Sequence, residues 1–205
     1  SRRQRQMCIR DRGAQSLNRV MHDALPGLAE KNIGVLQAVG PKNYDSADPV
    51  LGGAPEGAED LLLPAGIIAR NVAPSGAPAQ VQVPYISAMN LAYAAANLVI
   101  CRSGAMTVAE ISAVGLPALY VPLPIGNGEQ ALNAQPVVEA GGGILIEDHD
   151  LTAQQVIDWA DELLTTPDKY QAAVAGAFSA GSRNAADAVA RAACELVDYP
   201  LNAGH

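Results

Sequence analysis

Basic residues, cysteines, histidines and aromatic side chains are all scarce in this chain. Of its 205 residues, 13 are Lys or Arg and 21 are Asp or Glu, which gives a net charge of −8. A protein that binds nucleic acid needs clustered Lys and Arg to contact phosphates, so this acidic balance excludes nucleic acid as an expected partner. Long hydrophobic runs are lacking as well, since none approaches the roughly 20 residues that a membrane-spanning helix requires.

The few cysteines and histidines argue against two further classes of protein. Cys8, Cys101 and Cys194 have neither CxxC nor metal-ligand spacing, and the three histidines are scattered. A sparse, odd set of cysteines favours a reducing cytoplasm over a disulfide framework. We therefore expect no metal site and no cofactor. With 49% hydrophobic and 17% charged residues, the chain suits one globular domain with a sizeable core.

The first twelve residues differ from the rest of the chain. They are rich in arginine, show neither a helical nor a strand period, and lack the long apolar core of a signal peptide. We interpret residues 1–12 as foreign sequence, such as a misassembled reading frame produces, with residues 13–199 as the folded domain and 200–205 as a tail. A basic arm that binds nucleic acid is the alternative interpretation of residues 1–12.

The stretch 97–136 has the clearest pattern. It opens with a short apolar run that is typical of a strand buried on both faces of a parallel sheet. Small residues then form a turn, and apolar residues recur at helical spacing from about Thr107 until Gly115 and Pro117 end the helix. The stretch thus predicts a strand at 98–101, a turn at 102–105 and a helix from about 107 to 115. A second strand at 118–121, a polar loop and a second helix that starts near 129 follow.

Apolar patterns elsewhere predict an α/β fold, a Rossmann-like parallel sheet with helices on both faces. The segment 42–66 carries no period and is interpreted as an irregular surface excursion. Of the strand candidates 67–72 and 80–83, the alternative that only the second forms stays open. Thr152 and Gln155 match a capping box that opens a helix. Strands are also predicted at 33–39 and 144–146, and helices at 17–28, 89–95, 152–164, from 167 onward and at 184–197.

The turn before the central helix is the candidate binding site. Its backbone N–H groups at 103–105 lie at the positive end of a helix, which suits a phosphate, and its small side chains let a ligand approach. Glu110, about one turn further, is placed to accept hydrogen bonds from a ribose diol. Gln130 and Asn133 share one face of the next helix, and their amides can bond to sugar hydroxyls. Together these groups indicate a nucleotide-sugar pocket.

Each of these patterns also has a plainer interpretation. Thr107 and Glu110 match a capping box that only satisfies the start of the helix. Ser103 fits an ordinary N-cap. Gln130 and Asn133 fit a solvated helix face. Composition and spacing alone leave the function open.

Three motifs resemble the donor-binding half of the MurG family of glycosyltransferases. They are Cys101-Arg-Ser-Gly-Ala-Met-Thr-Val-Ala-Glu110, Gly115-Leu-Pro-Ala118 and Gly128-Glu-Gln-Ala-Leu-Asn-Ala134. The similarity runs from about Gly13 to Val197. It implies the C-terminal domain of a GT-B glycosyltransferase that moves N-acetylglucosamine, with inversion, from UDP-N-acetylglucosamine to the lipid-linked muramyl-pentapeptide (lipid I to lipid II) in peptidoglycan synthesis.

The resemblance also implies which groups lie outside this chain. In that family a strand and a Gly-Gly-Ser-Gln-Gly-Ala turn lead into the first helix, whereas Asp11 and Arg12 stand at the Ser-Gln positions here. The first strand of the sheet is therefore expected to be missing. The general base, the acceptor site and the membrane-facing surface belong to an N-terminal half, which places the whole enzyme peripherally at the cytoplasmic face of the bacterial plasma membrane. No catalytic residue is expected in this chain, and alone it is expected not to catalyse transfer.

The resemblance carries over donor contacts only. The backbone at Ile86 would read the uracil, the start of the central helix would hold the diphosphate, and the next helix would hold the sugar. Two residues depart from the usual pattern: Met106 replaces a Leu, and Glu129 replaces the Gln of some members, where a carboxylate near the diphosphate would repel it. The full set of implied site residues is Gly13, Ile86, Ser103, Gly104, Ala105, Met106, Thr107, Val108, Ala109, Glu110, Glu129, Gln130 and Asn133.

Alternatives from other classes remain at this point. One is a stand-alone donor-binding subunit of a split glycosyltransferase, and another is a non-catalytic UDP-sugar-binding module. A UDP-sugar epimerase of related fold would need a histidine in the pocket, and the sequence offers no suitable one beside Glu110.

Overall fold

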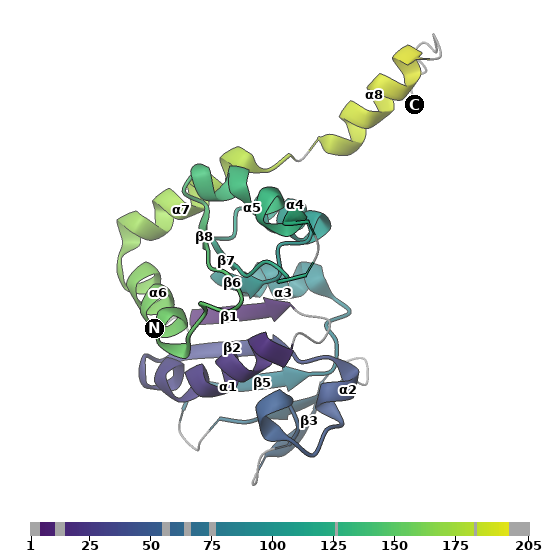
Figure 1. Cartoon of the computed structure of the whole chain (residues 1–205). Coiled ribbons are helices and arrows are strands. Elements are labelled where there is room, and N and C mark those ends of the chain that lie inside the picture. Colours follow the sequence, from purple (N-terminus) through teal and green to yellow (C-terminus); the bar gives the residue numbers. More distant parts are fainter. Residues whose placement is uncertain are drawn as a thin grey trace.

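A computed structural model of the chain describes residues 5–10, 15–54, 58–63, 67–73, 77–125, 127–182 and 184–196. Within these residues eight strands form one sheet (Figure 1). The strands are β1 (Arg5–Arg10), β2 (Ile33–Ala38), β3 (Glu59–Leu63), β4 (Ile67–Asn71), β5 (Gln80–Val83), β6 (Leu98–Cys101), β7 (Ala118–Tyr120) and β8 (Gly143–Leu145). The helices are α1 (Gln15–Glu30), α2 (Pro41–Tyr44), α3 (Met89–Ala95), α4 (Ala105–Val114), α5 (Glu129–Glu139), α6 (Ala153–Thr165), α7 (Pro167–Ala180) and α8 (Ala185–Leu196), with a 3₁₀ turn η1 (Pro49–Leu51).

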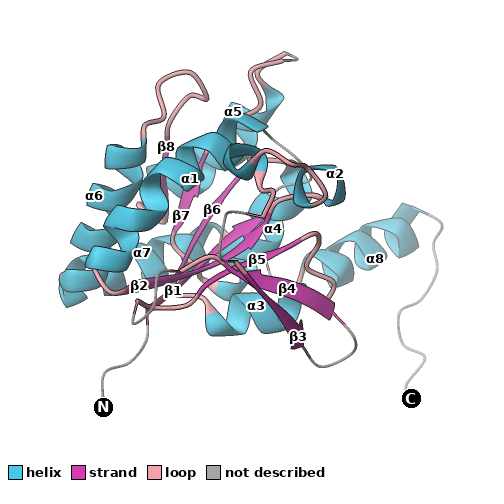
Figure 2. Ribbon diagram, turned by 90° about the horizontal axis from the view of Figure 1, so that it is seen from below, coloured by secondary structure: helices cyan, strands magenta, loops and turns pink. Residues whose placement is uncertain are grey.

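The strand order is β3-β4-β5-β2-β1-β6-β7-β8. From β5 to β8 all neighbours pair parallel, whereas β3 and β4 add an antiparallel edge beside β5. Helices cover both faces of the sheet (Figure 2). The predicted Rossmann-like α/β class is confirmed, with an antiparallel extension that the sequence patterns did not indicate.

The expectation that the first strand is missing is wrong. β1 (Arg5–Arg10) occupies the centre of the sheet and pairs parallel to both β2 and β6. Strands on either side of such a position present N–H and C=O groups that need partners, and a backbone ladder satisfies them whatever the side-chain pattern. The segment contains no proline, so every N–H group can join the ladder. The sheet therefore has no gap and no exposed strand edge between β2 and β6.

Part of the segment 42–66 is regular, which corrects the expectation of an irregular excursion. It contains η1 and β3, and β3 pairs with β4, so the strand candidate at 67–72 is real. Arg70 on β4 is buried, and its guanidinium carbon lies 4.0 Å from the ring centroid of Tyr44. Its Nη1 also donates to the carbonyl of Gly52 at 3.3 Å. One cation–π and hydrogen-bonding side chain thus ties the segment to the sheet.

Two apolar clusters lie on opposite faces of the sheet. In β6, Leu98 and Ile100 belong to the cluster under α1 and α6, whereas Val99 and Cys101 belong to the cluster under α3, α4, α5 and α7. This alternation follows the two-residue period of a strand, and because both sides are covered the strand reads as a continuous apolar run.

The predicted helix boundaries at the C-terminal end are confirmed. Thr152 and Gln155 form a reciprocal capping box at the start of α6. Pro167 opens α7, as its fixed φ and missing N–H allow. The last helix, α8, projects away from the sheet (Figure 1), and its described side chains are largely exposed. In the described part of the chain, every helix is too short or too polar to cross a bilayer.

Tyr120 on β7 is a buried tyrosine whose hydroxyl is unsatisfied. The residue is fully buried, and its Oη has no hydrogen-bond partner among the described groups. Burial raises the pKa of the phenol above its ordinary value, because the phenolate would lose its hydration. The hydroxyl therefore stays neutral and costs stability.

We expect Tyr120→Phe to leave the free energy of unfolding unchanged or to raise it by about 1 kcal/mol, because it removes an unsatisfied buried hydroxyl. Urea unfolding followed by circular dichroism measures the change. As a control, Leu119→Ala at the adjacent buried position should lower the free energy of unfolding by about 3 kcal/mol. A clear loss of stability in Tyr120→Phe would show that the hydroxyl has a partner.

Candidate functional site

The start of α4 is the centre of the candidate site. Gly104 is the N-cap, with φ −62° and ψ 144°, and no side chain caps the helix. The first intrahelical bond runs from Val108 N to Gly104 O at 3.0 Å. The N–H groups at positions 105–107 therefore have no acceptor within the helix, and they carry the positive end of its dipole. A Cβ added to Gly104 would meet no atom of the described residues within 4 Å, so among those residues the space beside this turn is open.

This geometry decides between the interpretations left open by the sequence. The helix begins at Ala105 rather than near Thr107, so Thr107 is its third residue and cannot be the N-cap of a capping box with Glu110. Ser103 precedes the N-cap and does not cap the helix either. Glu110 is therefore not used to satisfy the helix start.

Ser103 is fixed from the neighbouring helix. Its carbonyl accepts a hydrogen bond from Asn133 Nδ2 on α5 at 3.1 Å. Its side chain is fully buried, and its Oγ has no hydrogen-bond partner among the described groups. A buried hydroxyl without a partner is rare in folded proteins, and this one lies directly before the open helix start.

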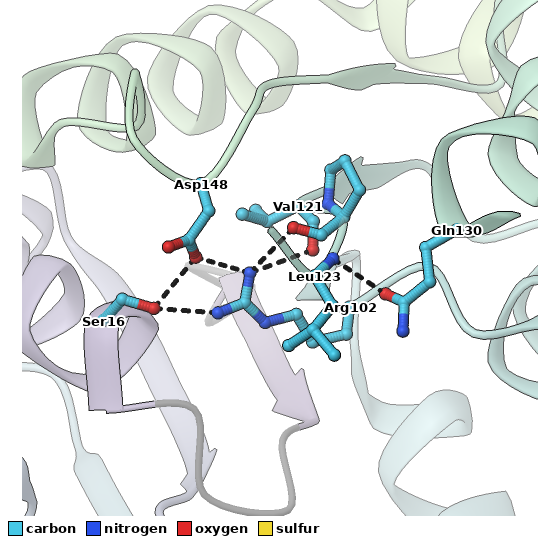
Figure 3. A network of polar contacts seen from close by, with 7 residues as sticks. Ser16, Arg102, Val121, Leu123, Gln130 and Asp148 are labelled. Carbon is cyan, nitrogen blue, oxygen red and sulfur yellow. Dashed lines mark hydrogen bonds and ion pairs between the residues drawn. The ribbon is translucent and has the colours of Figure 1, made fainter. Parts of the chain in front are cut away.

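Gln130 holds the loop between β7 and α5. Its Oε1 accepts a hydrogen bond from Leu123 N at 3.0 Å (Figure 3). Gln130 and Asn133 are both half-buried, so the alternative of a purely solvated helix face is wrong. Glu129, beside them, is exposed in the first turn of α5.

The predicted site residues Glu110 and Ile86 lie on two different elements. Glu110 is half-buried on α4, and its Oε2 accepts a hydrogen bond from Tyr93 Oη on α3 at 3.0 Å. Ile86 is buried in the loop between β5 and α3. Met106 is 72% exposed at the open end of α4. Gly13 lies outside the described residues.

Sequence patterns missed a buried ionic network below the turn. Arg102 Nη1 lies 2.5 Å from Asp148 Oδ1 and donates to the carbonyls of Val121 and Pro122 at 3.2 and 3.1 Å (Figure 3). Its Nη2 donates to Ser16 Oγ at 2.8 Å, and Ser16 in turn donates to Asp148 at 2.8 Å. The only signal in the sequence was a charged residue in a turn of small ones.

The network joins four elements at the carboxyl ends of the strands. Arg102 follows β6, the two carbonyls follow β7, Asp148 follows β8, and Ser16 lies in the first turn of α1. Both charged side chains are largely buried, with 12% and 14% of their surface exposed. A guanidinium forks to several acceptors at once, so it can fix the relative positions of these strand ends.

The site lies where open α/β sheets bind ligands, at the carboxyl ends of the strands. The turn after β6 and the loop after β7 are joined there through Arg102, and the loop after β5 follows the carboxyl end of its own strand. Across the described residues, no three side chains of His, Cys, Asp or Glu gather closely enough to hold a metal ion. The arrangement can bind an anion through backbone donors with a carboxylate one turn away. The fold and this site define the class as an open α/β domain with a site suited to an anionic ligand at the carboxyl ends of its strands.

Comparisons with known proteins agree with that class. The chain belongs to the glycosyltransferase family 28 C-terminal domain family, which matches residues 12–189. It is 53% identical over 184 residues to the UDP-N-acetylglucosamine–N-acetylmuramyl-(pentapeptide) pyrophosphoryl-undecaprenol N-acetylglucosamine transferase of Mycolicibacterium vanbaalenii, covering 90% of this chain and 40% of that protein. The enzyme of the same name from Mycolicibacterium smegmatis is 49% identical, with 90% and 42% covered.

A solved structure shows the same fold. The crystal structure of Acinetobacter baumannii MurG superimposes with a TM-score of 0.65 at 22% identity, over 92% of this chain and 51% of that one. The family match and the relatives confirm the resemblance inferred from the three motifs. The chain spans about two fifths of the length of the curated relatives.

The Arg102 network makes the first testable prediction for the site. Asp148→Asn should lower the free energy of unfolding by about 3 kcal/mol, because it leaves a largely buried guanidinium without its counter-charge. The matched control is Asp161→Asn, whose partner Lys31 is 47% exposed and screened by water, so its change should be much smaller. Denaturant unfolding of both variants measures the difference. Equal effects would mean that the network contributes little.

Proposed function

We propose that this chain is the donor-binding half of the enzyme that transfers N-acetylglucosamine from UDP-N-acetylglucosamine to the lipid-linked muramyl-pentapeptide, converting lipid I to lipid II. The observation that carries the proposal is the uncapped start of α4, where Gly104 leaves open space beside three backbone N–H groups. Relatives about half identical over 90% of this chain carry that activity in their names.

The diphosphate of the donor binds at the start of α4 in this proposal. The N–H groups of Ala105, Met106 and Thr107 donate to phosphate oxygens, and the helix dipole adds to the attraction. As the sugar leaves, negative charge builds up on the UDP, and fixed donors stabilise it. Val108 and Ala109 complete the turn that carries these donors.

Glu110 and Ile86 recognise the nucleoside. A carboxylate accepts hydrogen bonds from both ribose hydroxyls. The backbone N–H and C=O at Ile86 have fixed geometry, which suits the edge of a uracil.

The sugar lies toward α5. The Oε1 of Gln130 accepts a hydrogen bond from Leu123 N, so its amide nitrogen is the group that donates to a sugar hydroxyl. The Nδ2 of Asn133 donates a hydrogen bond to the carbonyl of Ser103, so its Oδ1 is the group that accepts from a sugar hydroxyl. Glu129 accepts from a sugar hydroxyl and stays away from the diphosphate, because like charges repel. Gly13, at the start of the chain's similarity to the family, stays a predicted contact.

The acceptor site and the general base belong to the N-terminal half of the whole enzyme, outside the part of the relatives that this chain matches. That half also holds the whole enzyme at the cytoplasmic face of the membrane. α8 supports this arrangement, because a helix whose exposed face carries alanines and Val189 suits packing against another domain.

Glu110→Ala tests the nucleoside contact. We expect it to weaken UDP binding at least about tenfold, because hydrogen bonds to a charged group are lost. Isothermal titration of the chain with UDP measures the affinity. Glu139→Ala, an exposed glutamate at the end of α5, is the matched control and should leave the affinity unchanged. An unchanged affinity in Glu110→Ala would contradict the assignment of Glu110.

Gly104→Ala tests the diphosphate contact separately from the fold. Its φ of −62° suits alanine and an added Cβ meets no atom of the described residues within 4 Å, so the free energy of unfolding should stay within about 0.5 kcal/mol. The added methyl group nevertheless occupies the space that a phosphate would enter, so UDP binding should weaken about tenfold while binding of uridine alone is little affected. Retained UDP affinity would place the diphosphate elsewhere.

A further inference from the structure

The Tyr93 hydroxyl makes a contact at the edge of the site that the sequence patterns did not indicate. Tyr93 on α3 is 7% exposed, and its Oη donates to Glu110 Oε2 at 3.0 Å. Both residues line a groove of about 770 Å³ between α3, α4 and α7. The carboxylate is therefore held by a buried phenol at a surface that a ligand can reach.

The ring of Tyr93 is fixed by the core of the domain. It belongs to the same buried cluster as Ile86, Val108 and Ile111. Val108 and Ile111 flank Glu110 on α4, whereas Ile86 lies in the loop that leads into α3. One buried cluster thus holds together the tyrosine, the helix that carries the carboxylate, and the loop assigned to the base.

A fixed hydrogen bond changes how readily Glu110 binds a ligand. A partly exposed glutamate populates several rotamers, and a ligand that binds it must pay the entropy of fixing one of them. A phenol that donates to one carboxylate oxygen restricts the rotamers beforehand, and the charge on the acceptor strengthens this bond. A carboxylate has about four acceptor positions, so it can bond to Tyr93 and to a vicinal diol together.

We propose that Tyr93 is a positioning residue that orients Glu110 toward the 2′- and 3′-hydroxyls of the nucleotide, and that it thereby sets the preference for a ribonucleotide over a 2′-deoxyribonucleotide. The inference rests on the proposed function, because it needs Glu110 to contact the ribose. It adds a residue on a different helix that acts through Glu110.

Titration of the chain with UDP and with 2′-deoxy-UDP tests this role. Tyr93→Phe should weaken UDP binding about fivefold, because Glu110 must then lose rotamer freedom when the ribose binds, and should weaken 2′-deoxy-UDP binding less than twofold, because that nucleotide keeps only one of the two hydroxyls. Tyr170→Phe is the matched control, because Tyr170 lines the same groove but donates to the carbonyl of Asn97 instead. It should leave the ratio of the two affinities unchanged.

A double-mutant cycle separates positioning from a merely structural role. In a Glu110→Ala background, Tyr93→Phe should have no further effect on UDP affinity, because it acts through the missing carboxylate. Equal weakening of both nucleotides by Tyr93→Phe, or an undiminished effect without Glu110, would overturn the inference.

The two substitutions distinguish a failure of the inference about Tyr93 from a failure of the proposed function. If Glu110→Ala weakens UDP binding and Tyr93→Phe does not, only the role of Tyr93 is wrong. If Glu110→Ala has no effect, or the unaltered chain shows no binding at millimolar UDP, the assignment of the site is wrong and the inference falls with it.

Discussion

An α-helix must leave its first N–H groups without intrahelical partners, and at the start of α4 no side chain of the described residues caps them. Most helices of globular proteins satisfy one such donor with Ser, Thr, Asp or Asn at the N-cap. Here the N-cap is Gly104, and the serine beside it turns its hydroxyl into the interior. Backbone donors that stay open on the protein are available to a ligand, and the surrounding structure fixes their direction.

Three long-range contacts hold this turn and its surroundings without covering it. Asn133 bonds to the carbonyl of Ser103 from α5, Arg102 ties the turn to the ends of β7 and β8, and Tyr93 holds Glu110 from α3. Each contact uses a polar side chain that reaches into a neighbouring element and leaves the helix end exposed. A site fixed in advance loses little entropy on binding, which is the physical advantage of the arrangement.

The sequence predicted the local parts of this site better than its long-range parts. Apolar runs indicated β6 and β7 because both faces of these strands are buried, and the capping box at Thr152 is local chemistry. The spacing of Thr107 and Glu110 fitted two helix starts equally well, and only the backbone angles at Gly104 decide between them. The contacts of Arg102 with Asp148 and of Tyr93 with Glu110 join residues brought together by the strand order, which no local pattern encodes.

The amino-terminal strand shows how differently fold and site depend on sequence. Residues 1–11 lie outside the family match, yet Arg5–Arg10 completes the sheet, because strand pairing needs only backbone donors and acceptors in register. The start of α4 requires more: a glycine with open space beside it, a neighbouring amide that holds the preceding carbonyl, and a carboxylate at the sixth helical position. A sheet position tolerates many sequences, whereas a binding turn of this kind tolerates few. Most of the residues proposed to bind the donor therefore lie within 101–134, and the strand beside them serves as scaffold.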